Sequence, residues 1–580
     1  PDRAGMPDVS GAAPAPAGRL TPPAPAGPPA PDILDLLGSL VDKSLVVATP
    51  GATGMRYRLL ETVAEYAGER LDEAGDRGAA ERRHLVHYRE LARRADPELR
   101  TGRQVVAIAR LGVEYGNLRT ALRRAVDARD EHEGLVLVHA LLWYWQMRDL
   151  RADALHWAEA VAALGPDPFE PPAAPVVPLH EPCIAAPPPL GEAQLWEARR
   201  GVRLIELLNM DHETGRWTTP EGLARLRRIT AVYPPGLPQT CRLPGTFAVF
   251  AVLLIGEAGR MHEALDANVD ACRRHGYEWE LANALTLRAN LLANRADWAE
   301  RAGTDADESL KIFVRLDDAW GAAEALSSRA ESRERRLDFE GAAEDFAAAI
   351  GYARRIGAQS QMALLRARYA DMLIETGRRE EAERILREVV EGGYGRGHEP
   401  MLAARIFLAM LLGRTGRTAE ARTHLLRLLD EFSPETLSIF EGFTLGSLGW
   451  VDNLDGRYDS AYELSRKAYE RSLGALSMMV APQMPAIHLI SAAWALAGLG
   501  GPGARTAAVL LGAYEALLPP AHLPPPIERE NRDRAAELTR SALGDDAAFE
   551  AAYAEGGGLS LEETAALLAR ADAIRKRDEP

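Results

Sequence analysis

The chain has 580 residues, a formal net charge of −16 at pH 7 and a sequence pI of about 5.4. This length exceeds what one hydrophobic core can hold, so we expect several domains or an elongated array. An acidic surface repels phosphate backbones, which argues against direct binding to DNA or RNA. Three cysteines without a CxxC pair favour a reducing cytosol, and no apolar run is long enough to cross a bilayer. These features predict a cytoplasmic protein without a membrane segment.

The N-terminal part of the chain changes character near residue 31. Residues 1–30 are mainly Pro, Ala and Gly, which predicts a disordered linker. An apolar helix face follows, at Ile33, Leu34, Leu36, Leu37 and Leu40. We then expect a strand at 44–48, a turn-rich loop at 49–54, a strand at 55–60 and a helix at 61–74. This order predicts a small winged-helix module with a short β-hairpin over residues 31–77.

The remainder of the chain has a helical pattern with two proline-rich interruptions. We expect helical hairpins over 78–165, a Pro-rich loop over 166–190, and a repeat array over 191–518. Capping helices should occupy 519–580, after the break at Pro519 to Pro526. Ser560 and Glu563 have the spacing of a capping box that opens the last helix.

A short phrase recurs in the second half of the chain. Its clear copies are Gly259 to Ala264, Gly377 to Ala382, Gly416 to Ala421 and Gly456 to Ala461, and degenerate copies run from Asp297 to Ala302 and from Asp338 to Ala343. The closing alanines are 38, 41, 39, 39 and 40 residues apart. A period of this size is typical of stacked helical hairpins. The fold class expected is therefore all-α, a tetratricopeptide-like solenoid of about 40-residue repeats that follows the winged-helix module. In each copy, the Gly or Asp should turn the chain and the Ala should let two helices approach closely.

Sequence motifs for chemistry are missing. There is no phosphate-binding GxxxxGK followed by Ser or Thr, no GxGxxG after a strand, no GxSxG and no HExxH. His84 and His87 lie three residues apart on a predicted helix, but no third metal ligand is evident nearby. We therefore expect no enzyme activity and no catalytic, cofactor-binding or metal-binding residues in this stretch.

Five aromatic residues are the candidates for contact with a ligand or partner: Trp143, Tyr144, Trp145, Trp298 and Trp320. Packing in the core is the alternative, because adjacent aromatic residues on a helix point in different directions.

Several segments resemble a known family. They are Leu36 to Val47, Tyr57 to Ala67, Arg82 to His84, Leu111 to Leu122, Leu510 to Leu517 and Ala554 to Glu563. Together they are similar to the region after the ATPase core in bacterial STAND-class transcriptional regulators of the NB-ARC, AfsR-like or LuxR-like kind. The resemblance implies that ATP or ADP binds only in an ATPase domain upstream of this stretch, and that a separate helix-turn-helix domain binds DNA. Leu60 stands where many NB-ARC proteins have a histidine that contacts ADP. The absence of a starting methionine also suggests a piece of a longer protein.

Two functions compete on this basis. In the first, the chain is the sensor and autoinhibitory region of such a regulator. It would bind an upstream ATPase domain or a protein partner, receive a small-molecule or peptide inducer, and control oligomeric switching. In the second, it is a free-standing tetratricopeptide adaptor for protein partners, which the missing phosphate-binding loop favours. The degenerate copies keep the spacing but lose Gly-Arg, so residues 297–343 are the expected place for a bound partner.

Overall fold

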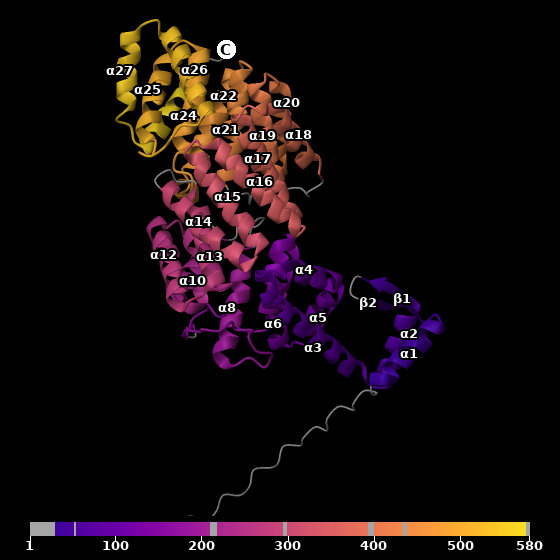
Figure 1. The fold of residues 1–580 in the computed structure, drawn as a ribbon. Helices are drawn as coiled ribbons and strands as arrows, with labels where there is room; N and C mark the ends of the chain where they lie inside the picture. The colour runs from indigo at the N-terminus through magenta and orange to yellow at the C-terminus, as the bar shows by residue number, and fades with distance from the viewer. Residues whose placement is uncertain are drawn as a thin grey trace, which may run out of the picture. The chain divides into compact units, whose positions relative to one another are not determined.

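A computed structural model describes residues 30–51, 54–173, 175–208, 217, 219–293, 298–392, 399–432 and 438–575. The predicted linker at 1–30 lies outside these residues except for its last position. The described residues are mainly helical, as expected, and their strands form one two-stranded sheet (Figure 1). The chain divides into two compact units, unit 1 from Pro1 to Leu85 and unit 2 from Val86 to Pro580. The division falls inside helix α3 (Arg77–Ala95), a few residues after the predicted boundary at residue 77.

Unit 1 has the predicted order of helix, two strands and helix. Its elements are α1 (Ala30–Asp42), β1 (Val46–Gly51), β2 (Gly54–Leu59), α2 (Glu61–Glu73) and the start of α3. The strands pair antiparallel, with Val46 opposite Leu59 and Gly51 opposite Gly54. The predicted loop at 49–54 is therefore mostly strand, since Thr49 and Pro50 pair with Arg56 and Met55. The loop prediction was wrong there because Pro and Gly are tolerated in an edge strand.

The first part of unit 2 consists of helices that pack on their neighbours. After α3 the elements are η1 (Asp96–Arg100), α4 (Gln104–Val113), α5 (Tyr115–Asp127), α6 (Glu131–Arg148), α7 (Arg151–Ala162), α8 (Glu192–Leu208), α10 (Pro220–Val232), η2 (Pro238–Cys241), η3 (Gly245–Phe247) and α11 (Ala248–Ile255). The predicted loop at 166–190 has neither helix nor strand among its described residues. Gln239 anchors it by donating to the Val177 carbonyl at 2.7 Å and accepting from the Leu179 amide at 3.2 Å.

The middle of unit 2 is a succession of helical hairpins. Its helices are α12 (Ala258–His275), α13 (Glu278–Ala293), α14 (Ala299–Leu316), α15 (Ala319–Arg335), α16 (Phe339–Arg355), α17 (Gln359–Glu375), α18 (Arg379–Glu391), α19 (Glu399–Arg414), α20 (Thr418–Glu431), α21 (Ser438–Leu454) and α22 (Tyr458–Ser472). Each packs on the next, and α13 on α15, α17 on α19 and α19 on α21 stack successive hairpins. The six closing alanines of the phrase all lie near the start of a helix and are buried.

The C-terminal end of unit 2 closes the array. It contains α23 (Ala475–Val480), α24 (Met484–Leu499), α25 (Gly503–Leu517), α26 (Pro526–Leu543), α27 (Asp546–Gly556) and α28 (Leu561–Arg575). One continuous apolar core extends from α17 to α28. The predicted capping box is confirmed: the Ser560 amide donates to Glu563 at 2.9 Å, and the Glu563 amide donates to the Ser560 hydroxyl at 3.1 Å.

The Gly-Arg phrase turns the chain and starts the next helix. In three copies the glycine has a left-handed backbone, with φ of 86° at Gly377, 79° at Gly416 and 74° at Gly456. The arginine that follows occupies the N-cap position of α18, α20 or α22. Glycine suits this turn because it has no Cβ to clash at positive φ.

Two copies depart from this scheme. Gly259 lies inside α12, so its predicted role as the turning residue is wrong; Gly256, with φ of 82°, makes that turn. In the copy that begins at Asp338, Leu337 has the positive φ, at 63°. Asp338 instead caps α16, because its carboxylate accepts from the Gly341 amide at 3.0 Å. Asp297 lies outside the described residues.

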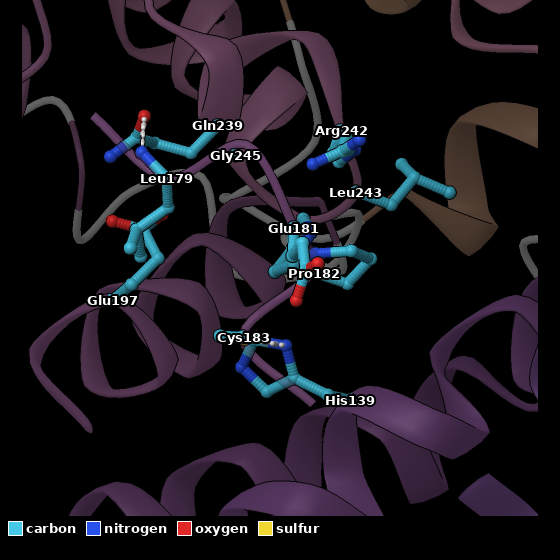
Figure 2. Close-up of a pocket in the computed structure, with 11 residues that line it drawn as sticks. His139, Leu179, Glu181, Pro182, Cys183, Glu197, Gln239, Arg242, Leu243 and Gly245 are labelled. Atoms are coloured by element: carbon cyan, nitrogen blue, oxygen red, sulfur yellow. Dashed lines mark hydrogen bonds between the residues drawn. The ribbon is translucent and has the colours of Figure 1, made fainter. Parts of the chain in front are cut away.

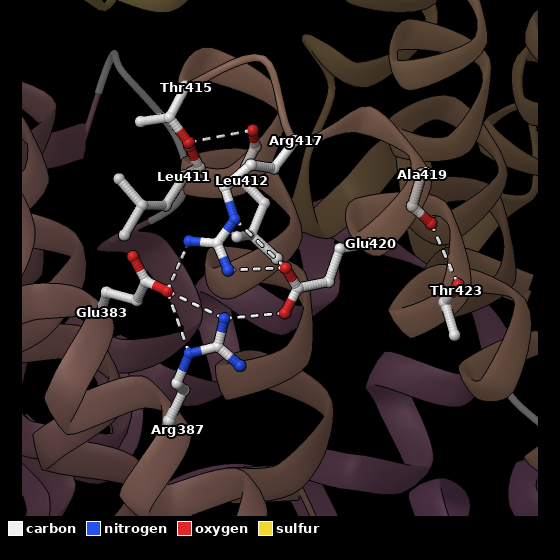
Figure 3. A network of polar contacts seen from close by, with 9 residues as sticks. All are labelled: Glu383, Arg387, Leu411, Leu412, Thr415, Arg417, Ala419, Glu420 and Thr423. Carbon is white, nitrogen blue, oxygen red and sulfur yellow. Dashed lines mark hydrogen bonds and ion pairs between the residues drawn. The ribbon is translucent and has the colours of Figure 1, made fainter.

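One arginine of the phrase, Arg417, also ties two neighbouring hairpins together (Figure 3). Arg417 donates to Glu420 of its own helix at 2.6 Å and to Glu383 of α18 at 2.7 Å. Arg387 closes the network with bonds of 2.8 Å to Glu383 and 2.7 Å to Glu420. Hydrogen bonds from Arg387 and Arg417 hold the pKa of Glu420 below its usual value. These side chains are all partly exposed, so each pair contributes at most about 1 kcal/mol.

A more buried version of this link occurs between the earlier hairpins. Arg288 of α13 donates a hydrogen bond of 2.7 Å to each carboxylate oxygen of Asp305 in α14. It also donates to Asp266 of α12 at 2.8 Å. One hairpin later, Arg329 of α15 grips Asp345 in α16 at 2.9 and 2.6 Å. In these two hairpins, the second helix thus carries an arginine that binds an aspartate on the first helix of the next hairpin.

Helix α23 joins segments that are far apart in the chain. Met479 packs in a buried cluster with Val249 and Val252 of α11 and Met261 of α12. Val480 lies against the same cluster. This short helix therefore links the C-terminal end of unit 2 to its first hairpins.

Candidate functional site

The structure brings together two of the five aromatic candidates. The rings of Trp143 in α6 and Trp320 in α15 are 6.1 Å apart, and Trp279 of α13 lies edge-on to Trp143 at 5.4 Å. Trp279 was not among the five candidates predicted from the sequence. Trp143 is only 7% exposed, so the three rings pack mainly against one another and leave little of Trp143 free for a ligand.

A buried carboxylate organises this aromatic cluster. Asp318, at the start of α15, accepts from Trp279 Nε1 at 2.7 Å, from Gln104 Nε2 at 2.8 Å and from the Gly321 amide at 2.9 Å. Burial raises the pKa of Asp318 above its ordinary value. The contacts join α4 to α13 and α15, which is a structural role.

The other three candidates lie elsewhere in unit 2. Tyr144 and Trp145 are buried, and Trp145 Nε1 donates to the Tyr115 hydroxyl at 2.9 Å. Trp298 is half-buried and stacks on His262, with ring centres 4.6 Å apart. The five residues do not form one site, and their contact with a ligand or partner stays a prediction.

The positions considered for chemistry lie in a helix or next to one. His84 and His87 are in α3, and Leu60 is the exposed N-cap residue of α2. Within the described ranges, no group of three or more His, Cys, Asp or Glu side chains is arranged to hold a metal ion.

A small pocket lies where the 166–190 loop meets α6 and α8 (Figure 2). Its volume is about 20 Å³, which is enough for one water molecule. Cys183 Sγ lies 3.5 Å from His139 Nδ1. Burial raises the pKa of the Cys183 thiol, and burial lowers the pKa of His139. Both shifts disfavour the thiolate–imidazolium pair that a cysteine nucleophile needs.

A much larger cavity, of about 460 Å³, lies inside the second half of unit 2. Helices α15, α17, α19, α21, α23, α24 and α26 contribute to its wall, together with the segment from His522 to Pro525. The lining is mostly apolar and includes Leu402, Phe407, Met410, Phe443, Trp450 and Ile487. This volume is within the range of about 300–1,000 Å³ that is typical of small-molecule sites.

Charged side chains cluster on one side of the cavity. Asp371 of α17 lines it, and burial together with the charge of Glu334 raises the pKa of Asp371 well above its ordinary value. The neighbouring Glu375 is paired with Arg414 of α19 at 2.6 Å. Arg368 lies 3.6 Å from Glu331 and 3.9 Å from Glu334. Asp371 is thus a carboxyl group whose negative charge the protein compensates poorly.

Helix α24 contributes two side chains with ring nitrogens, His488 and Trp494, to the wall of the cavity. His488 is 4% exposed and Trp494 is 1% exposed. His488 Nε2 and Trp494 Nε1 have no hydrogen-bond partner among the described residues. Burial lowers the pKa of His488 to about 4, so the ring is neutral at pH 7. A buried polar atom without a partner is costly, and a ligand can supply the missing bond.

His488 should make the stability of unit 2 depend on pH. Its pKa is about 4 when folded and about 6.5 when unfolded, so the unfolded chain binds the proton more tightly. Stability is therefore full above pH 6.5 and falls as the pH drops toward 4, by up to about 1.4 kcal/mol per pH unit. Urea unfolding across this range should show a steeper decline for the wild type than for His488→Gln. Parallel curves for the two proteins would contradict the assignment.

The sequence offered little sign of this cavity. Its wall combines residues from Glu334 to Asn531 on at least seven helices. No local spacing in the sequence predicts that these residues lie together. His488 and Trp494 lie in an apolar helix that periodicity alone describes as buried core. His488 and Trp494 differ from ordinary core residues only in having ring nitrogens without hydrogen-bond partners among the described residues, and a structure is needed to find such atoms.

Comparison with known proteins links part of the chain to transcriptional regulators. No family model matches the sequence. Over 129 residues it is 36% identical to proteins of Mycobacterium bovis and Mycobacterium tuberculosis that are provisionally named HTH-type transcriptional regulators. The match covers 22% of this chain and 14% of each relative.

Two solved structures align along most of the chain at low similarity. The tetratricopeptide domain of P58(IPK) is 16% identical to this chain, with a TM-score of 0.17. The alignment covers 76% of this chain and 99% of that domain. A circular tandem repeat protein is 13% identical, covers 86% of this chain and 100% of its own, and has a TM-score of 0.15. At these scores neither superposition informs the fold, which rests on the helix packing described above.

The described helices also bear on membrane insertion. None of them combines the length and the apolar character that a bilayer-spanning helix needs. The chain is thus a mostly helical protein that shares a stretch of sequence with transcriptional regulators.

Proposed function

We propose that this chain is the sensor and protein-interaction region of a larger STAND-type transcriptional regulator. The 129-residue similarity to the mycobacterial proteins carries the proposal. Unit 1 would be the winged-helix module that docks on an ATPase domain outside this sequence, where ATP or ADP would bind. Unit 2 would be a tetratricopeptide-like array that receives an inducer or partner and thereby controls oligomeric switching.

The surface of unit 1 supports the docking role. Several large apolar side chains of α1 are exposed, with Leu34 at 71%, Leu36 at 56% and Ile33 at 50%. On β2, Met55, Tyr57 and Leu59 alternate along the strand, so they share one face, and all three are exposed. A module that leaves several large apolar side chains exposed on both α1 and β2 is a candidate for a protein-binding face.

The docking role can be tested with the whole chain and a separately expressed ATPase domain encoded in the same reading frame. Leu34→Asp combined with Leu36→Asp should weaken their association by tenfold or more, since a buried leucine contributes about 1.5–3 kcal/mol. Glu69→Ala on the exposed surface of α2 is the matched control and should leave binding unchanged. Light scattering and calorimetry measure the complex. Equal binding by the wild type and the double variant would remove the docking role.

A free-standing adaptor is the alternative function. The absence of a phosphate-binding loop from the 580 residues favours it. The reading frame upstream of Pro1 decides between the two, because an in-frame GxxxxGK motif there is required by the regulator and excluded by the adaptor.

A further inference from the structure

We propose that the cavity of unit 2 binds a small amphipathic amine, a mainly apolar molecule that places its ammonium group beside Asp371 and a hydrogen-bonding atom next to His488. This inference rests on the proposed sensor function for its biological meaning, although binding itself can be measured independently.

The apolar body of the ligand follows from the cavity wall. The volume of about 460 Å³ is bounded on several sides by aliphatic and aromatic side chains, among them Phe407, Phe443 and Trp450. Trp450 Nε1 already donates to Asn531 at 3.0 Å, so its ring offers an apolar face. Burying a hydrocarbon body against such a wall is favourable in proportion to the apolar area removed from water.

The positive charge of the ligand follows from the groups around Asp371. Glu334 on α15 and Glu375 on α17 raise its pKa, whereas Arg368 on α17 and Arg414 on α19 lower it. Burial and the carboxylates outweigh the arginines, so the net shift of the Asp371 pKa is upward. Asp371, Glu334 and Glu375 all line the cavity, and an ammonium group beside them would supply positive charge that favours the ionised carboxyl group.

A negatively charged ligand would find a poorer match at the same place. Arg414 is committed to Glu375 at 2.6 Å, and Arg368 lies near Glu331 and over the Phe407 ring. A carboxylate in the cavity would face Asp371 and Glu334 without an uncommitted cation from these two arginines. The whole wall has four carboxyl groups, Glu334, Asp371, Glu375 and Glu528, against two arginines, Arg335 and Arg368, so its charges disfavour an anion.

The second anchor of the ligand is on α24. His488 Nε2 is buried, lines the cavity and lacks a hydrogen-bond partner among the described residues. The neutral ring can donate or accept at this atom, depending on its tautomer. A hydroxyl or amide on the ligand satisfies it in either case, which fixes the orientation of the apolar body between α17 and α24.

The test compares decylamine, decanol and decanoate by isothermal titration calorimetry with the complete chain. Decylamine should bind at least about tenfold more tightly than decanol, the factor that one pKa unit of charge coupling represents. Decanoate should bind most weakly. Asp371→Asn should lower the affinity for decylamine to that for decanol, and it should leave the affinity for decanol unchanged. Glu344→Gln, at an exposed carboxylate of α16, is the matched control and should keep the preference.

Two further readings keep the test decisive. Added salt should weaken the binding of decylamine but leave the binding of decanol unchanged, and Asp371→Asn should abolish this difference. Ala403→Phe, which adds a ring to the cavity wall, should weaken both the amine and the alcohol; circular dichroism verifies that it folds. Equal affinity for the three probes, or no binding at millimolar concentration, would overturn the proposal.

The outcome is separable from that of the proposed function. Decylamine that binds with the expected preference but leaves association with the ATPase domain unchanged would overturn the sensor role and keep the cavity assignment. Association with the ATPase domain, without any binding of decylamine to the cavity, would overturn the cavity assignment and keep the proposed function.

Discussion

Asp305→Ala is expected to lower the free energy of unfolding of unit 2 by about 4 kcal/mol, because removing one partner of a buried ion pair leaves the other charge uncompensated. Asp305 is 4% exposed and accepts two 2.7 Å bonds from Arg288, which is itself 6% exposed. Asp266 lies 2.8 Å from the same guanidinium, yet it is on the more exposed side and cannot replace both bonds.

Urea unfolding followed by circular dichroism measures this loss, and hydrogen exchange locates it. Protection should fall first in α13 and α14, which the ion pair joins. Arg505→Ala is the control, since Arg505 and Glu555 form a pair that is 64% and 51% exposed. That change should stay within about 0.5 kcal/mol. A loss below about 1 kcal/mol for Asp305→Ala would show that the buried pair does not hold the hairpins together.

Gly512→Val should destabilise the C-terminal helices by more than about 3 kcal/mol, at the upper end of overpacking effects. Gly512 of α25 and Gly556 of α27 meet where the two helix backbones touch. A Cβ at Gly512 would overlap the Tyr553 carbonyl, and a Cβ at Gly556 would overlap the Val509 carbonyl. Backbone atoms cannot move aside as a flexible side chain can, so the helices would have to separate.

The matched control for this prediction is Gly351→Ala. Gly351 lies in the interior of α16, and no atom comes within 4 Å of the position of an added Cβ. Alanine is the better helix former, so this change should raise stability by up to about 1 kcal/mol. Thermal unfolding measures both variants. A wild-type melting temperature for Gly512→Val would refute the close approach of α25 and α27.

Local patterns in the sequence predicted local structure well. The capping box at Ser560 and the β-hairpin of unit 1 depend on residues a few positions apart, and the structure confirms both. The turn at the first phrase was misplaced, because Gly256 and Gly259 offer two glycines within one helical turn and spacing alone could not choose between them. The turn at Leu337 could not be predicted either, since a leucine at positive φ has no sequence signature.

Long-range features could not be predicted from one sequence. Trp143 and Trp320 were selected, but their meeting with Trp279 depends on how α6 packs against the hairpins. Gln104 reaches Asp318 across 214 residues of chain, and nothing near either residue points to the other. The cavity has the same origin, because its wall is assembled by the stacking of hairpins and each hairpin alone shows only an ordinary apolar face.

Helix α23 gives unit 2 an unusual order of assembly. Neighbouring hairpins make contacts that are local in the chain and should form early, whereas Met479 reaches Met261 and Val249 only after all the hairpins between them are in place. The contact is therefore expected to be the last to form and the first to open. Val480 and Ala481, which follow Met479, also line the cavity, so the latest step in folding is the step that completes its wall. Brief release of this one helix would widen the cavity while the hairpins stay folded.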